Sequence, residues 1–281
     1  MITTIVILFA GALFAGFLGS LTGLGGGVVI VPLLTLGFGV DLRYAIGTSL
    51  IAVIATSSGA ASAYMKEGLL NIRIGMFLEI ATTFGAIAGA AIAMFAPTHA
   101  IAVVFGLVLL YSAYVSFQKG TEHTVTEDLP GKKPGRLVRL LKAKGTYVSA
   151  NGPKDYTLQN LGGGFSVMGL AGILSGLLGI GSGALKVIAM DSIMKIPFKV
   201  STSTSNFMIG VTAAASAGVY LTRGYIDPVL SMPVMVGVLI GSLVGAKLLL
   251  KSRTKSIRIV FAIVVGFLAL EMIYNGITKN I

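Results

Sequence analysis

Gly23-Leu24-Gly25-Gly26-Gly27 separates an apolar run, Ile2 to Leu21, from a shorter one, Val28 to Leu36. The pattern returns 156 residues later as Gly179-Ile180-Gly181-Ser182-Gly183, again between two short apolar runs. Glycines allow a chain to turn sharply and its backbone to approach a neighbour or a ligand closely. Because the break occurs twice in matched surroundings, the sequence predicts that these two stretches form the working centre of one fold.

The repetition extends over most of the chain. Identities at the same offset run from Ala15/Ala171 to Gly89/Gly245, and they include Thr48/Thr204, Ser49/Ser205 and Thr56/Thr212. So long a shared register indicates an internal duplication, which is common in transporters. We therefore expect a first transmembrane repeat over 1–118, a polar basic insert over 119–163 and a second transmembrane repeat over 164–281.

Composition indicates a membrane protein. Hydrophobic residues make up 55% of the 281 residues and charged residues only 11%, and the mean hydropathy is +0.92. Soluble domains carry about 25% charged residues, and a membrane helix needs about 20 apolar residues. Segments of that kind recur at 44–64, 73–95, 100–118, 200–222, 228–249 and 257–276. The sequence thus predicts an all-α polytopic membrane protein.

The net charge of +11 comes from Lys and Arg in the loops between spans, where basic residues orient membrane proteins. We therefore expect a lipid bilayer as partner and no nucleic acid. The N-terminal run has no basic flank, so a cleaved signal peptide is not expected.

No enzyme class is favoured. The chain has no Cys, neither His99 nor His123 lies in an apolar segment, and the patterns G-x-S-x-G and H-E-x-x-H are absent. An intramembrane hydrolase would need a nucleophile with its base, or a bound metal. We expect no enzymatic activity, no cofactor and no metal.

The glycine-broken segments allow two topologies. The arms Val28 to Leu36, Phe165 to Leu178 and Ala184 to Met194 are too short to cross a hydrocarbon core of about 30 Å at about 1.5 Å per residue. Each broken segment either crosses once, which makes the repeats parallel, or returns as a hairpin, which makes them inverted. The first arm, Ile2 to Leu21, is longer than a half-span arm requires.

Basic residues distinguish the two topologies. Parallel repeats put 12 Lys and Arg on the side of the insert and 8 on the other side, whereas inverted repeats put 17 against 3, with Lys186 inside a hairpin. The positive-inside rule favours inversion. The sequence therefore predicts two inverted-topology repeats, each a glycine-tipped short helical hairpin plus three transmembrane helices, about 10 membrane helical segments in all.

Two hairpins from opposite sides would bring their glycine tips together near the midplane. Irregular backbone at that depth occurs where it is buried in protein or lines a wet cavity, and it marks binding sites in transporters. Backbone N–H groups and a helix start favour an anion, and Lys186 is the one charge between Gly172 and Met190. The predicted substrate-binding residues are Gly23, Gly25, Gly26, Gly27, Thr48, Ser49, Gly179, Gly181, Ser182, Gly183, Lys186, Thr204, Ser205 and Asn206.

Each assignment has a structural alternative. Glycine clusters also serve close helix packing, hydroxyls bond back to their own helix, and Lys186 could snorkel to the surface. Glu79 is the acid most clearly inside a span, which makes it the candidate for proton coupling; its alternative is snorkelling or pairing with Arg73.

Two further patterns predict local structure. The small-xxx-small spacing of Gly85 to Gly89 recurs as Gly241 to Gly245 and predicts close helix packing in lipid. Within the insert, 137–141 indicates a basic amphipathic helix and Tyr147 to Tyr156 a turn or small hairpin. The insert could act as a cytoplasmic linker, sense a ligand or lie on anionic headgroups.

With the doubled glycine cluster, Gly47-Thr48-Ser49, Ser203-Thr204-Ser205 and the basic central loop, the chain resembles the sulfite exporter TauE/SafE family over nearly all of its length except the insert. The resemblance implies a prokaryotic inner-membrane protein with 119–163 in the cytoplasm. It also implies a path lined by the two glycine clusters together with Thr48, Ser49 and Ser203 to Ser205.

The resulting hypothesis is a secondary transporter, with export as the expected direction, for a small sulfur-containing or organic anion such as sulfite or a sulfonate (sulfoacetate). It would work by alternating access between the inverted repeats, with a proton or sodium as candidate coupling ion and a homo-oligomer as candidate assembly. The alternatives are a passive anion channel and a transporter of a non-sulfur organic anion.

Overall fold

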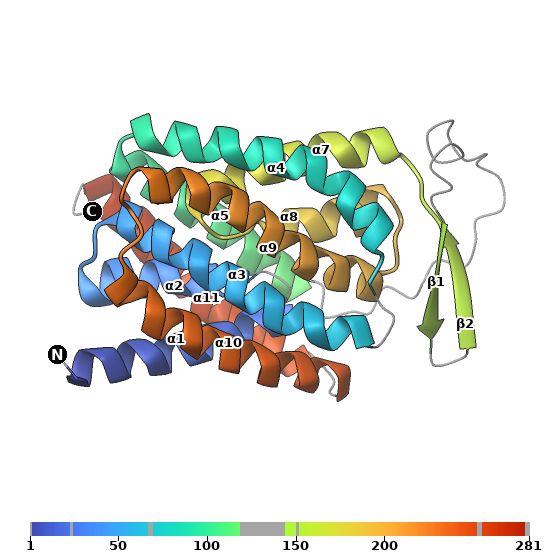
Figure 1. Ribbon diagram of the computed structural model, residues 1–281, viewed down its shortest axis with the longest axis horizontal. Helices are drawn as coiled ribbons and strands as arrows, with labels where there is room; N and C mark the ends of the chain where they lie inside the picture. The colour runs from blue at the N-terminus through green and yellow to red at the C-terminus, as the bar shows by residue number, and fades with distance from the viewer. Residues whose placement is uncertain are drawn as a thin grey trace.

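A computed structural model of the chain describes residues 2–22, 25–66, 70–118, 144–149, 152–251 and 255–278. Its long helices lie side by side along the longest axis of the molecule (Figure 1), and seven of the described helices are long and apolar enough to cross a membrane. The long helices are α1 (Ile2–Thr22), α3 (Leu42–Lys66), α4 (Ile72–Phe95), α5 (Thr98–Gln118), α7 (Leu161–Leu178), α9 (Phe198–Thr222), α10 (Pro228–Lys251) and α11 (Lys255–Thr278). The predicted all-α polytopic fold is confirmed.

Two short helices follow the glycine clusters. α2 (Gly27–Pro32) continues into the π-helical turn η1 (Leu33–Gly37), and α8 (Gly183–Ile188) continues into η2 (Ala189–Ile193). The two π-helical turns occupy the same position in each repeat, which supports the duplication. Counting each short helix with its π-helical turn as one, the described residues form ten helical segments, as the sequence predicts.

The two repeats are inverted relative to each other. α5 and α11 are equivalent helices, and they run antiparallel: Gly106 packs against Ile273, whereas Gly276 packs against His99. Equivalent helices that run in opposite directions require a two-fold axis perpendicular to them. Figure 1 shows the same relation, since the first hairpin starts at the end of the molecule that holds both termini and the second starts at the opposite end, beside the strands.

Equivalent contacts join the repeats across this axis. α1 packs along α10, and α7 packs along α4. A Cβ at Gly241 would overlap the carbonyl oxygen of Leu13, and a Cβ at Gly85 would overlap that of Gly169, which is the position equivalent to Leu13. The backbones therefore approach too closely for any side chain, which confirms the packing role predicted for the small-xxx-small spacing.

Both hairpin tips lie against the central helix α3. Gly26 of the first tip faces Thr56 of α3, whereas Gly179 of the second tip lies against Ile46 and Ser49 of the same helix. These two contacts lie about two turns apart along α3.

The described part of the insert is a β hairpin. β1 (Lys144–Ser149) pairs antiparallel with β2 (Gly152–Thr157), so the predicted hairpin is present, and the helix expected over 137–141 lies outside the described residues. Asn71 Nδ2, at the start of α4, donates to the Tyr156 hydroxyl at 2.7 Å. Burial raises the pKa of the Tyr156 phenol, and the Asn71 hydrogen bond lowers it.

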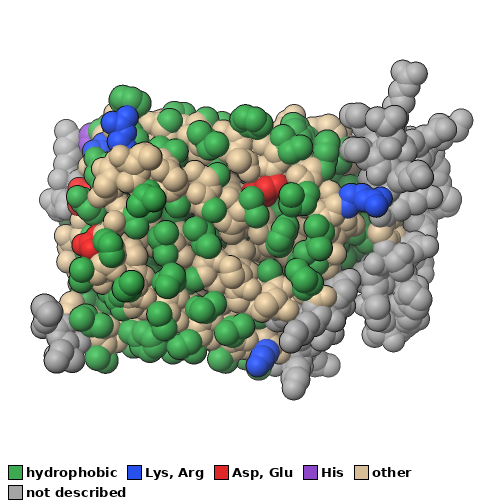
Figure 2. Space-filling model, in the orientation of Figure 1, with side chains coloured by type: hydrophobic (Ala, Val, Ile, Leu, Met, Phe, Trp, Pro, Cys, Tyr) green, Lys and Arg blue, Asp and Glu red, His purple; other side chains and the backbone are tan. Residues whose placement is uncertain are grey.

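The outer face of the helices is apolar. Hydrophobic side chains are spread over the whole face shown in Figure 2, and charged ones are few. Phe84, Phe95 and Val229 are each more than two-thirds exposed. Exposed apolar side chains on a helical bundle are typical of contact with lipid tails. With the seven candidate spans, this surface makes the chain a multi-pass membrane protein.

The close glycine contacts generate a stability prediction. We expect Gly85→Ala and Gly241→Ala each to lower the free energy of unfolding by about 1–3 kcal/mol, because the new methyl group would force two helix backbones apart. Thermal unfolding in detergent measures the effect. The matched control is Gly218→Ala in α9, where a Cβ meets nothing within 4 Å and helix propensity favours Ala by about 1 kcal/mol. Equal melting temperatures for all three variants would contradict this packing.

Candidate functional site

The two glycine tips are in direct contact. A Cβ at Gly27 would lie 2.7 Å from the carbonyl oxygen of Gly179. Ser49 Oγ donates to that same carbonyl at 2.7 Å and ties α3 to the second tip. Gly23 lies outside the described residues. The structure thus brings Gly27, Gly179 and Ser49 together, with the tips packed against each other.

Apolar side chains fill the space around the tips. A Cβ at Gly25 or at Gly181 would face Val53 and Ile209, which are equivalent residues of α3 and α9. Gly25 and Gly181 have φ values of +80° and +69°, a backbone conformation that glycine adopts without strain. In this conformation apolar side chains pack directly against both tips.

A buried chain of hydrogen bonds links the second hairpin to the first repeat. Lys186 Nζ of α8 donates to Thr212 Oγ1 of α9 at 2.5 Å, and Thr212 Oγ1 lies 2.5 Å from Glu79 Oε1 of α4, to which it donates. Lys186 is 0% exposed and Glu79 is 4% exposed. A lysine and a glutamate thus share one hydroxyl in the interior of the bundle.

The snorkelling alternatives are wrong for both charged residues. Lys186 is fully enclosed, and Glu79 bonds to Thr212 and, at 3.5 Å, to Thr83 Oγ1. Arg73 is exposed near the start of α4, so the proposed Arg73 pairing is also replaced by the link to Lys186. Intramembrane charges that are buried and paired in this way mark functional sites in membrane proteins.

The polar chain occurs on one side of the two-fold axis and has no counterpart on the other. At the equivalent positions of the duplication, Lys186 corresponds to Ile30 and Glu79 to Met235, and only Thr212 keeps its polar partner, Thr56. Ile30 is buried and Met235 is about a third exposed, so the shared architecture forms with apolar residues at both places. The charges are therefore not a requirement of the fold.

Further buried polar atoms lie on α4, α7 and α9. Among the described residues, Asn206 Nδ2, Thr202 Oγ1, Ser175 Oγ and Glu79 Oε2 are enclosed and have no hydrogen-bond partner. Buried polar groups normally find partners, so an unpaired set calls for a ligand or water as explanation. Leu50, Ile46 and Gly19 occupy the positions equivalent to the first three. Arg43 Nε, near the start of α3, is a further enclosed atom without a partner among the described residues.

Several other predicted site residues support the second hairpin. Ser205 Oγ donates to the Gly183 carbonyl at 3.3 Å, and the Ser182 hydroxyl donates to the Ala171 carbonyl. Ser203 is buried in α9. These hydroxyls tie the tip to α7 and α9 to the start of α8.

Thr48 and Thr204 lie away from the tips. Thr48 Oγ1 accepts from Ser231 of α10 at 3.5 Å, and Thr204 Oγ1 accepts from the backbone N–H of Asn71 at 3.2 Å. These contacts lie toward opposite ends of the bundle, and they join α3 to α10 and α9 to the start of α4. The structure does not bring either threonine to the glycine tips.

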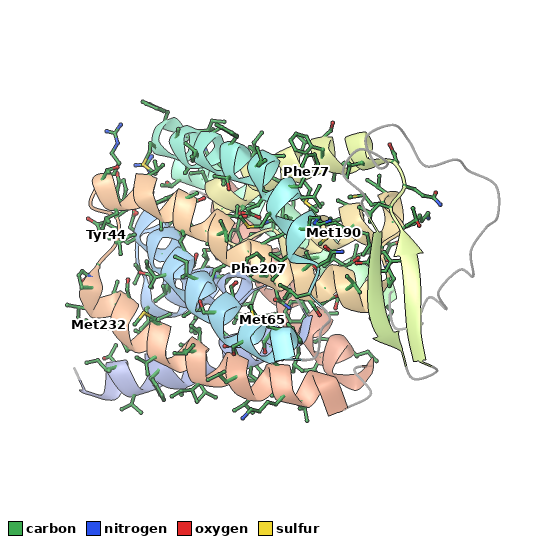
Figure 3. All side chains as sticks on the ribbon, turned by 45° about the vertical axis from the view of Figure 1, so that its right-hand side comes forward. Tyr44, Met65, Phe77, Met190, Phe207 and Met232 are labelled. Carbon is green, nitrogen blue, oxygen red and sulfur yellow. The ribbon has the colours of Figure 1, made fainter. Side chains whose placement is uncertain are left out.

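The surroundings of the site are apolar. A methionine-rich cluster packs between α4, η2 and α9, and Figure 3 labels one member from each, Phe77, Met190 and Phe207. A shallow pocket beside the second tip is lined by Val28, Val108, Tyr111, Ser112, Ile180, Ser182, Gly183 and Leu185. Over the described ranges, no group of three His, Asp or Glu residues could hold a metal ion.

Thr212 is the residue that sequence reasoning missed. In the sequence, Thr212 stands out only because Thr56 is the identical residue of the first repeat. That identity does not indicate which groups its hydroxyl bonds to. Ser57 is a second such residue: its hydroxyl donates to the Asn206 carbonyl at 2.5 Å and accepts from the backbone N–H of Gly210 at 3.1 Å. Both hydroxyls join helices that are more than 130 residues apart in sequence.

Comparisons with known proteins agree with this architecture. The chain is 29% identical to the probable membrane transporter protein YunE of Bacillus subtilis (strain 168) over 279 residues, which cover 97% of this chain and 98% of that protein. It is 24% identical to the probable membrane transporter protein MJ0441 of Methanocaldococcus jannaschii over 274 residues, 92% of this chain and 91% of that protein. No solved structure matches the chain.

The family described as Sulfite exporter TauE/SafE matches residues 8–272. That range includes both glycine tips, the lysine and glutamate of the buried chain and every described membrane helix except the outer ends of α1 and α11. The chain therefore belongs to the Sulfite exporter TauE/SafE family and is a membrane transporter.

Proposed function

We propose that the chain is a secondary transporter of a small sulfur-containing or organic anion, such as sulfite or a sulfonate, and that the anion binds beside the second glycine tip. The observation that carries the proposal is the buried ammonium of Lys186. Of its three N–H donors, one bonds to Thr212, and no other acceptor among the described residues bonds to it. The two remaining donors suit oxygens of an anion.

α9 carries two further unpaired polar atoms, Asn206 Nδ2 and Thr202 Oγ1. They lie six and ten residues before Thr212, and therefore at other depths of the same helix. The buried ammonium alone favours a ligand of negative charge. The predicted residues at the second hairpin, Gly179 to Gly183 and Lys186, belong to this proposed site.

Alternating access follows from the two hairpins. Each hairpin comes from one end of the bundle, so a shift of one tip past the other would open the site to one side at a time. The direct contact between Gly27 and Gly179 favours a carrier over a passive channel, which needs a continuous path. Export is the proposed direction, through a prokaryotic inner membrane with residues 119–163 in the cytoplasm.

The first test is transport itself. Purified protein in liposomes should exchange radiolabelled sulfite or sulfoacetate across the membrane, with a rate that saturates as the anion concentration rises. Empty liposomes provide the background. Absence of exchange for these anions would reject the sulfur-anion hypothesis, and a rate that never saturates together with single-channel conductance would support the channel instead.

The glycine tips generate a second prediction. Gly181→Ala should slow anion exchange at least about tenfold, because the new methyl would press on Ile209 at the contact that has to slide. Gly224→Ala is the matched control: Gly224 has a similar φ of +75°, but a Cβ there meets nothing within 4 Å. The backbone cost of about 1 kcal/mol is shared by the two variants. Equal exchange rates would remove the tip contact from the mechanism.

The first repeat supplies the residues for a third prediction. Lys186→Ile alone should lower the free energy of unfolding by about 3 kcal/mol, because Glu79 loses its buried counter-charge. The double variant Lys186→Ile, Glu79→Met carries the residues found at the equivalent positions. It should regain most of that stability in thermal unfolding and still transport nothing. A double variant that transports like the natural protein would show that the pair is structural.

A further inference from the structure

We propose that Glu79 and the transported anion compete for Lys186, so that Glu79 takes up one proton each time one anion binds. This inference rests on the proposed function and adds the ion that drives it. When no anion is bound, the ionised carboxylate of Glu79 would neutralise the Lys186 ammonium. When Glu79 is protonated, the ammonium would be free to bind the anion.

The geometry places the carboxylate in that role. A single hydroxyl, that of Thr212, joins Glu79 to Lys186. Its Oγ1 lies 2.5 Å from Lys186 Nζ and 2.5 Å from Glu79 Oε1. Thr212 Oγ1 also lies 2.9 Å from the Met208 carbonyl of its own helix. The hydroxyl can therefore turn from the carboxylate to that carbonyl without moving its helix, which would release Glu79 from the lysine.

Charge balance sets the stoichiometry. With the site empty, one ammonium and one carboxylate sum to zero in a closed interior. An anion of charge −1 would leave one uncompensated negative charge, and buried charge of that kind is strongly unfavourable. Protonation of Glu79 removes it. No covalent bond other than the new O–H is made or broken, and the proton returns to water when the anion leaves.

The second carboxylate oxygen provides the place for this proton. Glu79 Oε2 is enclosed and has no hydrogen-bond partner among the described residues. The proton can therefore bind at Oε2 without first breaking a hydrogen bond.

Other charged groups on the neighbouring elements lie apart from the pair. α4 also carries Arg73, which is exposed near the start of the helix, and η2 carries Asp191, which is half-buried and has its own partner. The Tyr220 hydroxyl of α9 donates to the Gly176 carbonyl at 3.3 Å, and α7 has no charged residue. Glu79 is thus the titratable group in hydrogen-bond connection with Lys186.

With this coupling, the direction of transport depends on the sum of the anion gradient and the proton gradient. A monoanion that moves with one proton carries no net charge, so the membrane potential exerts no force on it. Acid outside favours uptake, and export proceeds when the anion gradient exceeds the opposing proton gradient. A dianion that moves with one proton carries one net negative charge.

The test uses the full chain in liposomes with methanesulfonate, a monoanion whose charge does not change near neutral pH, and with sulfoacetate, a dianion. Anion exchange without any gradient is measured first, because its absence would reject the proposed function and not the coupling alone. An acid-outside gradient should then accumulate exchanged methanesulfonate about tenfold per pH unit, independent of membrane potential. Sulfoacetate flux, with one proton, should respond to the potential.

Glu79→Gln separates the coupling from the binding. The amide keeps the size and a hydrogen bond to Thr212 but takes up no proton. We expect exchange to continue, accumulation driven by the pH gradient to disappear, and methanesulfonate flux to become sensitive to membrane potential. Glu271→Gln in α11, a partly buried acid of another membrane helix, is the matched control and should behave like the natural protein.

Thermal unfolding confirms that each variant is folded before its flux is compared. The inference would be overturned if the Glu79→Gln variant still accumulated anion against its gradient with acid outside. It would also be overturned if the natural protein exchanged anion but showed no accumulation driven by the pH gradient. If Glu79→Gln loses exchange while it remains folded, the carboxylate is part of the binding site and not a competitor of the anion, which also overturns the inference.

Discussion

A backbone that breaks inside a bilayer has to find its hydrogen-bond partners within the protein, because lipid tails offer none. Much of this fold follows from that constraint. The Gly179 carbonyl accepts from Ser49 of α3, and the Gly183 carbonyl accepts from Ser205 of α9. The central helices α3 and α9 therefore hold the second hairpin by hydroxyl groups, and the remaining helices shield this polar interior from lipid.

Because the interior is closed to water, the positions of the buried charges of Lys186 and Glu79 indicate a function. A fold built twice could have placed equivalent residues on both sides of its axis, and the backbone contacts of the small glycines do repeat in this way. Lys186 and Glu79 do not repeat, and Ile30 and Met235 occupy the equivalent positions. Because buried charge is costly and the architecture forms without it, the asymmetric pair is best explained by chemistry and not by folding.

Sequence reasoning predicted the architecture well because each step rested on a local or additive property. Apolar length located the spans, the offset of 156 residues located the repeats, and the asymmetry of basic residues indicated inversion. It did less well on the site. Thr48 and Thr204 were grouped with the tips, but the helices rotate them toward α10 and α4, because a helix position alone does not say which neighbour it faces.

By itself, the sequence determined that this protein is a duplicated, inverted helical membrane protein with a glycine break in each half, since composition, periodicity and charge are properties of the chain. Tertiary structure decided that the two tips touch and that Lys186 meets Glu79 through Thr212. Lys186 and Glu79 belong to different repeats and are more than 100 residues apart. Only the packing of α8 and α9 against α4 brings them within reach of one hydroxyl, because short-range polar chemistry depends on distances that no spacing along the chain specifies.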